Sequence, residues 1–149
     1  MAFSNALLGI VHSMAHKTGA AYSGGHIVHG CANAMYLPKV IKFNAKEAEA
    51  AKRYAEIARF IGLKGSTDGE LVDALIAELR AMNGKLNIPA CIREYEGGII
   101  DEKEFNEKLP SVAELAVGDA CTGSNPRPIT PAEMEKLLTC CYYDKEVDF

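Results

Sequence analysis

The chain has few of the features that direct a protein to nucleic acid or to a charged lipid surface. Its 149 residues carry 16 Lys and Arg against 20 Asp and Glu, for a net charge of -4, and the basic residues form no block. Nucleic acids and anionic membranes are recognised by basic blocks or by basic stretches interleaved with aromatics. We therefore expect no nucleic acid partner and no membrane partner.

Long hydrophobic runs and paired cysteines are also lacking. The apolar N-terminus is interrupted by Asn5, His12 and Ser13 and has no charged leader, so it reads neither as a signal peptide nor as a membrane span. The cysteines number five, an odd count without Cys-x-x-Cys spacing, which predicts neither a disulfide framework nor a zinc ribbon. The expected compartment is reduced and cytoplasmic.

No stretch alternates apolar and polar residues with the period of a strand, whereas apolar residues recur at helical spacing along most of the chain. A chain of this length buries roughly 70% of its unfolded surface on folding. We expect an all-α fold of six or seven helices in a single domain, residues 1–149. The predicted helices cover residues 1–21, 29–43 with a bend or break at Pro38, 44–61, 70–82, 101–109, 111–117 and 130–141.

Several helix starts are marked by a short polar residue followed three positions later by glutamate, the spacing of a capping box. These pairs are Asn44 with Glu47, Asp101 with Glu104, Ser111 with Glu114, and Thr130 with Glu133. Pro110 is expected to separate the helix that begins at Asp101 from the one that begins at Ser111.

The first predicted helix, residues 1–21, is apolar on nearly all sides, which is typical of a helix at the centre of an assembly. A narrow polar stripe of Asn5, Gly9, His12 and His16 follows one face, since these residues succeed one another at steps of four, three and four. His12 and His16 are one turn apart, with about 6 Å of axial rise between them. A glycine pair, Gly24-Gly25, then breaks the helix.

All four histidines of the protein, His12, His16, His26 and His29, lie in this region. Core histidines bonded to backbone or to Asn5 would account for an isolated pair. However, an unpaired imidazole on so apolar a helix costs about 1–3 kcal/mol, and neutral imidazole is a good ligand for divalent Fe, Zn, Ni or Co.

Acidic ligands are not evident beside these histidines. The first acidic residue is Glu47, and Ser13 stands where a His-Glu-x-x-His metalloprotease motif would carry its glutamate. A divalent ion normally takes at least three protein ligands, often with a carboxylate among them. From the residues alone, the histidine cluster is therefore interpreted as half of a metal site.

Four segments of the sequence resemble motifs of the iron-containing (group III) alcohol dehydrogenases. They are Met-Ala-Phe-Ser-Asn-Ala-Leu-Leu-Gly at 1–9, His-Ser-Met-Ala-His-Lys-Thr-Gly at 12–19, His-Gly-Cys-Ala-Asn-Ala at 29–34 and Asp-Ala-Cys-Thr-Gly-Ser-Asn-Pro-Arg at 119–127. The resemblance runs from end to end but covers only the C-terminal helical half of that family. It implies a dehydroquinate-synthase-like helical bundle, with the Rossmann-like nucleotide-binding domain absent from this chain.

The resemblance also implies roles for individual residues. His12 and His29 match metal ligands, His16 matches an active-site histidine that relays the alcohol proton, and Phe3 and Cys121 match walls of the substrate pocket. The connection before His29 is longer than is common in the family, so His26 competes with His29 for the second ligand position. We prefer His29, because the Gly-x-x-Asn-Ala run follows it.

The activity implied is NAD(P)-linked interconversion of a small alcohol and an aldehyde, assisted by a divalent metal, with Fe2+ expected and Zn2+ as the alternative. NAD or NADP would bind through the missing N-terminal domain, so we expect weak metal binding and no dehydrogenase activity from the chain by itself. An apolar patch around Phe3, Leu7 and Cys121 would favour association with that domain or a homo-oligomer. The alternatives are a non-catalytic helical module and a self-contained metal-binding protein that uses all four histidines.

Overall fold

The computed structural model describes residues 8–149, and this part of the chain is helical throughout, without strands. Its helices are α2 (Ile10–Thr18), α3 (His29–Asn44), α4 (Ala48–Phe60), α5 (Asp68–Lys85), α6 (Glu102–Val117) and α7 (Pro131–Tyr143), with short 3-10 helices η1 (Ile92–Gly97) and η2 (Thr122–Ser124). The all-helical prediction is confirmed. None of the described helices combines the length and the apolar character needed to cross a membrane.

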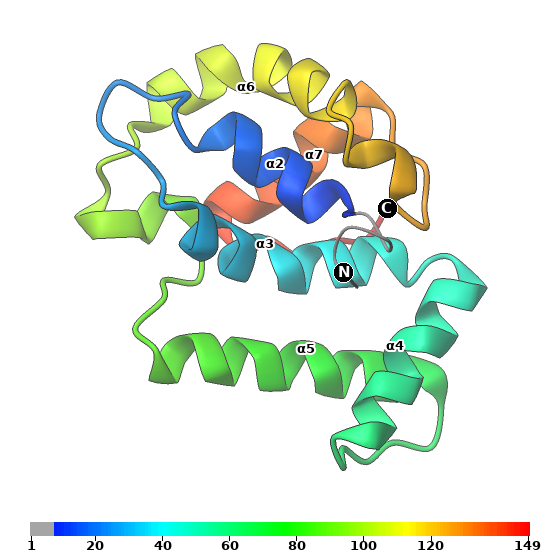
Figure 1. Cartoon of the computed structure of the whole chain (residues 1–149). Helices are drawn as coiled ribbons and strands as arrows, with labels where there is room; N and C mark the ends of the chain where they lie inside the picture. The colour runs from blue at the N-terminus through cyan, green and yellow to red at the C-terminus, as the bar shows by residue number, and fades with distance from the viewer. Residues whose placement is uncertain (1–7) are drawn as a thin grey trace.

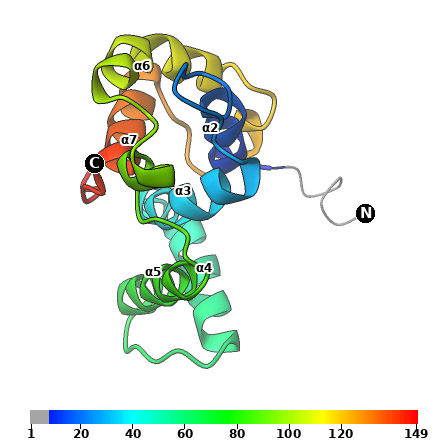
Figure 2. The ribbon, with the colours of Figure 1, turned by 90° about the vertical axis from the view of Figure 1, so that its left-hand side faces the viewer.

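Helix α3 runs through the middle of the molecule and separates two groups of helices (Figure 1). Helices α2, α6 and α7 lie on one side of it and the α4–α5 hairpin lies on the other, as the side view also shows (Figure 2). The larger core lies on the first side and contains Met14, Tyr36, Phe105 and Leu137. A smaller cluster under the hairpin joins Ile41 of α3 to Leu71 and Leu75 of α5, with the alanines of α4.

The N-terminal helix is shorter and less enclosed than the sequence predicted. Among the described residues it begins at Ile10, after Gly9 in extended conformation, and ends at Thr18. Thr18 closes it, because its hydroxyl donates to the carbonyl of Met14 at 2.8 Å and lies 2.9 Å from the Tyr36 hydroxyl. One side of α2 is buried, but His16 on the other side is exposed. Within residues 8–149, α2 is therefore not buried on all sides.

Prolines do not interrupt the helices. Pro38 lies inside α3 and is buried; its missing N–H would have bonded the carbonyl of Ala34, and that carbonyl instead accepts from Asn83 Nδ2 of α5 at 2.8 Å. The predicted break at Pro110 was wrong as well. Helix α6 passes through it because Phe105 before it and Val112 after it are both buried in the same core, so packing outweighs the local preference.

Two of the four predicted capping boxes place helix starts correctly. The side chains of Asp101 and Thr130 accept the backbone N–H of the glutamate three residues on, and Thr130 with Glu133 makes the full reciprocal pair. Asn44, however, is the last residue of α3 and does not cap α4, whose N-cap is Glu47. The Ser111 hydroxyl bonds Lys108 within the continuous α6.

The turn between α2 and α3 depends on glycines at a close approach to another segment. A Cβ on Gly24 would lie 1.9 Å from the carbonyl oxygen of Ile99, and one on Gly25 would lie 2.3 Å from the Ile99 side chain. The turn closes on itself through a hydrogen bond from the Ile27 N–H to the Gly19 carbonyl at 2.9 Å. Only glycine permits this approach, which returns the chain to α2.

We predict that Gly24→Ala destabilises the fold by about 3 kcal/mol or more, because its methyl group meets backbone that cannot move aside. Urea unfolding followed by circular dichroism measures this. Gly84→Ala in α5 is the matched control, since nothing lies within 4 Å of its Cβ position; it should be neutral or stabilise by up to about 1 kcal/mol. Equal effects of the two variants would contradict the close packing of Gly24.

Asp144 joins three helices at the end of α7, where it adopts a left-handed conformation with φ 55°. Its carboxylate lies 2.9 Å from the buried Lys39 ammonium of α3 and accepts from Arg80 of α5 at 2.7 and 2.5 Å. Burial by itself would raise the pKa of Asp144, but the hydrogen bonds from Lys39 and Arg80 outweigh it and hold the pKa below its ordinary value.

We predict that Asp144→Asn lowers the free energy of unfolding by about 1–3 kcal/mol at neutral pH, since it leaves buried Lys39 without its counter-charge. Asparagine tolerates the same backbone conformation, and the substitution removes the charge and replaces one acceptor oxygen by an amide donor. The pKa of Asp144 is lower in the folded protein than in the unfolded one. Its contribution to the free energy of unfolding is therefore complete above the unfolded pKa of about 3.9, and it is lost as the pH falls through the folded pKa. Urea unfolding at pH 7 and in acid should show the two proteins converging in acid.

Candidate metal centre

Three of the four histidines converge on one side of the molecule. His12 and His16 come from α2, and His29 is the first residue of α3, which packs directly against α2. The ring centroid of His29 lies 5.3 Å from that of His12 and 5.3 Å from that of His16, and the His12 and His16 centroids are 6.1 Å apart. The glycine turn therefore brings the second motif back beside the first.

The charge state of the cluster suits metal binding. Burial lowers the pKa of His12, and the neighbouring rings of His29 and His16 lower it further. His12 is consequently neutral at physiological pH, which is the form of imidazole that coordinates a metal. Neutral imidazoles from two helices fit the donor preference of a divalent transition ion such as Fe2+ or Zn2+.

A carboxylate also stands beside the histidines, contrary to the expectation from the sequence. Asp119 follows α6 and its Oδ2 lies 3.3 Å from His16 Nδ1 and 3.0 Å from Lys17 Nζ. The Asp119 side chain is only 10% exposed, against 39% for His16. Sequence reasoning missed it because 103 residues separate the two; the signal available was its place at the head of the Asp-Ala-Cys-Thr-Gly phrase.

Cys121 lies on the same side of the cluster as Asp119. Its N–H donates to Asp119 Oδ1 at 3.0 Å, and its sulfur lies within 4.8 Å of donor atoms of His16 and Asp119. Burial raises the pKa of the Cys121 thiol, and the adjacent Asp119 carboxylate raises it further. The metal-free thiol is therefore protonated at neutral pH and packs as a small apolar group.

His12 also lines an open cleft of about 480 Å³ formed by α2 and α3, with contributions from α4 and from the turn at 124–126. Its walls are mainly apolar, with a few amide groups, and Cys121 is not among them. The lining residues are Leu8, Gly9, Val11, His12, Asn33, Ala34, Leu37, Val40, Asn44, Tyr54, Ser124, Asn125 and Pro126. Phe3, the other predicted pocket residue, and Leu7 of the predicted apolar patch lie outside the described residues.

His26, the competing ligand, occupies a different position. It is exposed in the glycine turn, and its Cε1 lies close to Gly19, where a Cβ would approach it to 3.6 Å. The ring contacts in residues 8–149 join His12, His16 and His29 to one another and do not include His26. The geometry thus favours His29 over His26 as the partner of His12.

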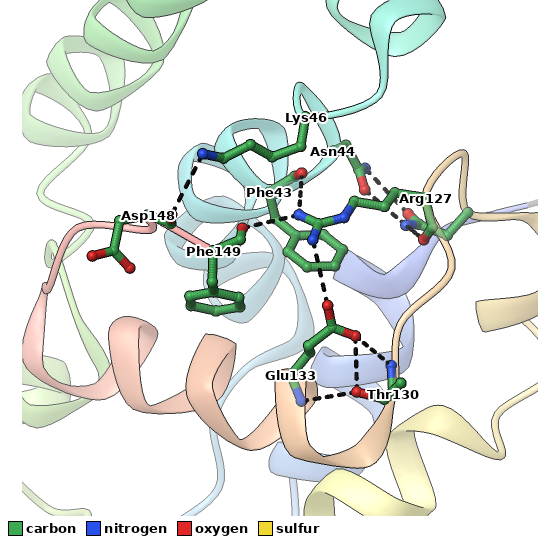
Figure 3. Close-up of polar contacts among 9 residues, drawn as sticks. Phe43, Asn44, Lys46, Arg127, Thr130, Glu133, Asp148 and Phe149 are labelled. Atoms are coloured by element: carbon green, nitrogen blue, oxygen red, sulfur yellow. Dashed lines mark hydrogen bonds and ion pairs between the residues drawn. The ribbon is translucent and has the colours of Figure 1, made fainter.

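The Asn-Pro-Arg turn at 125–127 fixes the ends of the helices around the cleft. Asn125 Nδ2 donates to Asn44 Oδ1 at 2.7 Å, Asn44 Nδ2 donates back at 3.2 Å, and Asn125 Oδ1 also accepts from the Ile10 N–H at 3.4 Å. Arg127 bonds the carbonyls of Phe43 and Phe149, both at 3.0 Å, as Figure 3 shows. The turn therefore serves as a structural anchor for α2 and α3.

Comparison with known proteins agrees with this arrangement. The family model described as the Fe-containing alcohol dehydrogenase family, C-terminal, matches residues 1–142. The chain belongs to the iron-containing alcohol dehydrogenase family. It is 56% identical over its whole length to the NADPH-dependent butanol dehydrogenase of Clostridium saccharobutylicum, of which it covers 36%.

Other members of the iron-containing alcohol dehydrogenase family show the same partial coverage. The bifunctional aldehyde-alcohol dehydrogenase of Escherichia coli K12 is 36% identical over 98% of this chain and 17% of its own length. The solved iron-containing alcohol dehydrogenase from Thermococcus thioreducens superposes with a TM-score of 0.75 at 32% identity, over 93% of this chain and 32% of the other. The chain thus spans about a third of the butanol dehydrogenase that it matches and corresponds to the C-terminal helical domain.

We predict that Asn125→Ala lowers the free energy of unfolding by about 1–3 kcal/mol, because buried Asn44 loses its reciprocal amide partner. Asn44 retains its contact with the Tyr54 hydroxyl at 3.1 Å. Chemical denaturation measures the loss. Asn106→Ala on the exposed side of α6 serves as the control and should change stability by less than about 0.5 kcal/mol; a similarly small change for Asn125→Ala would contradict the anchoring role.

Proposed function

We propose that this chain supplies the metal-binding part of an NAD(P)-linked alcohol dehydrogenase, with His12 and His29 as two ligands of a divalent ion. The proposal is carried by one observation, the 5.3 Å separation of the His12 and His29 rings, which brings together two motifs 17 positions apart. The lowered pKa of His12 supports its role as a ligand. Two histidines supply only part of the ligand set of a divalent ion, so the remaining ligands would come from another domain. Fe2+ is the proposed ion and Zn2+ the alternative.

When bound, a divalent ion supplies Lewis acidity toward the oxygen of an alcohol or a carbonyl. The residues of this chain do the positioning: His12 and His29 would hold the ion from one side, and His16 would accept the proton that leaves the alcohol hydroxyl. His16 suits this role because its ring contacts His29 and yet remains 39% exposed. The apolar cleft beside His12 would take the carbon chain of a small alcohol or aldehyde.

The nicotinamide cofactor would come with a Rossmann-like nucleotide-binding domain, which the 149 residues do not contain. The butanol dehydrogenase at 56% identity is named for NADPH, which supports NADPH over NADH and a short alcohol as substrate. Covering the open side of α2 with that domain would exclude water from the histidine cluster and strengthen the electrostatic interactions inside it. A homo-oligomer and a cytoplasmic location remain part of the proposal.

We predict that the purified chain binds Zn2+ or, under anaerobic conditions, Fe2+ weakly at one site, because it offers only part of a four-ligand set. Titration against a chromophoric chelator measures the affinity. His12→Ala and His29→Ala should each weaken binding by about tenfold or more, since even residues that only support metal ligands contribute 10- to 100-fold. The chain alone should show no NAD(P)-linked oxidation of butanol.

His26→Ala is the matched control, because it removes an imidazole from the same turn outside the ring cluster. Unchanged binding in this variant supports the assignment of His29. Metal uptake that survives the loss of both His12 and His29 would overturn the proposed site. Tight stoichiometric binding that requires His26 would instead favour a self-contained metal-binding protein built from all four histidines.

A further inference from the structure

The contact between Asp119 and His16 determines which ring nitrogen of His16 carries hydrogen. Hydrogen bonds hold the pKa of Asp119 far below its ordinary value despite its burial, so the group is ionised. An ionised carboxylate can only accept hydrogen bonds. At 3.3 Å from Asp119 Oδ2, His16 Nδ1 must therefore be the donor, and in the neutral ring the lone pair is left on Nε2.

The Asp119 carboxylate is itself fixed from both sides. Its Oδ1 accepts the N–H of Cys121 at 3.0 Å, within the same turn. Its Oδ2 lies 3.0 Å from Lys17 Nζ and 3.3 Å from His16 Nδ1, both on α2. Each oxygen thus has an assigned donor, and the orientation of the carboxylate does not depend on His16.

A cation between His16, Asp119 and Cys121 is a weaker interpretation of the same three side chains. Oδ2 of Asp119 already pairs with the Lys17 ammonium, which repels a second positive charge. Burial and the carboxylate raise the pKa of the Cys121 thiol, so a metal, which binds the thiolate, would have to displace the thiol proton at an added cost. The group is better suited to orient an imidazole than to bind an ion.

We propose that Asp119 is a positioning residue that holds His16 in the Nδ1–H tautomer, so that Nε2 is the proton acceptor of the active site. This inference rests on the proposed role of His16 in proton transfer and extends it to a second residue. The same logic operates wherever a carboxylate orients a general-base histidine: the carboxylate selects the tautomer and stabilises the protonated ring.

The Asn variant tests this directly, because the Cys121 N–H still requires an acceptor at the Oδ1 position. Lys17 Nζ lies 3.0 Å from Oδ2 and would favour the amide oxygen at that position, so the test variant combines Asp119→Asn with Lys17→Met. In this double variant the amide oxygen accepts the Cys121 N–H, and the amide nitrogen faces His16. An N–H facing Nδ1 donates to it, which moves the ring hydrogen to Nε2. The substitution is therefore expected to invert the tautomer without changing the shape of the side chain.

Long-range 1H–15N correlation spectra of the uniformly labelled, metal-free chain report the tautomer of each histidine, with His16→Gln identifying the His16 signals. At about pH 8, above the ordinary histidine pKa, we expect Nδ1 of wild-type His16 to be the protonated nitrogen by about tenfold or more, as a hydrogen bond to a charged partner implies. In the double variant Asp119→Asn with Lys17→Met the preference should reverse.

Lys17→Met is the matched control, since it removes the other donor to Asp119 Oδ2 and leaves the His16 contact in place; it should keep the wild-type tautomer. A wild-type His16 protonated at Nε2 overturns the proposal whether or not the variants fold, and so does a folded double variant, Asp119→Asn with Lys17→Met, that keeps the wild-type pattern. The measurement requires neither metal nor turnover. A failure of the Asp119 proposal can therefore be distinguished from a failure of metal binding at His12 and His29.

Discussion

The reciprocal amide pair between Asn44 and Asn125 is the contact on which the arrangement of the histidine cluster depends. It joins the last residue of α3 to the Asn-Pro-Arg turn, and Asn125 Oδ1 also accepts from the Ile10 N–H at the first turn of α2. At the other end of α2, Thr18 lies 2.9 Å from the Tyr36 hydroxyl of α3. The two helices are thus joined at both ends of α2, and the histidines of α2 lie between these contacts.

This double attachment explains how a site can be ordered on an open face. Helix α2 buries Ile10, Met14 and Ala15 in the main core and presents His12 and His16 on the side that the chain leaves uncovered. Asp119 reaches the same side from the end of α6, where the Cys121 N–H and the Lys17 ammonium fix it. The donors are therefore positioned by the bundle itself, before any further domain or ion is added.

Local signals in the sequence predicted the parts of the fold that local energetics control. The Thr130–Glu133 capping box places the start of α7 because both of its hydrogen bonds close within four residues. The same reasoning failed at Asn44, whose amide serves Asn125 instead of capping α4, and at Pro38, where Asn83 supplies the donor that the proline lacks. In each failure a partner distant in sequence replaced the local one, and no single-sequence pattern reveals such a partner.

Residue spacing alone predicted that the chain is helical and that its histidines concentrate before position 30, and short motifs placed it among the iron-containing alcohol dehydrogenases. These follow from residue spacing and from motifs of a few consecutive residues. The fold was needed to establish that His29 lies beside His12, and that Asp119 contacts His16. The reason is physical: the direction in which a glycine turn returns, and the approach of residues 103 positions apart, are set by the packing of α2 against α3 and α6.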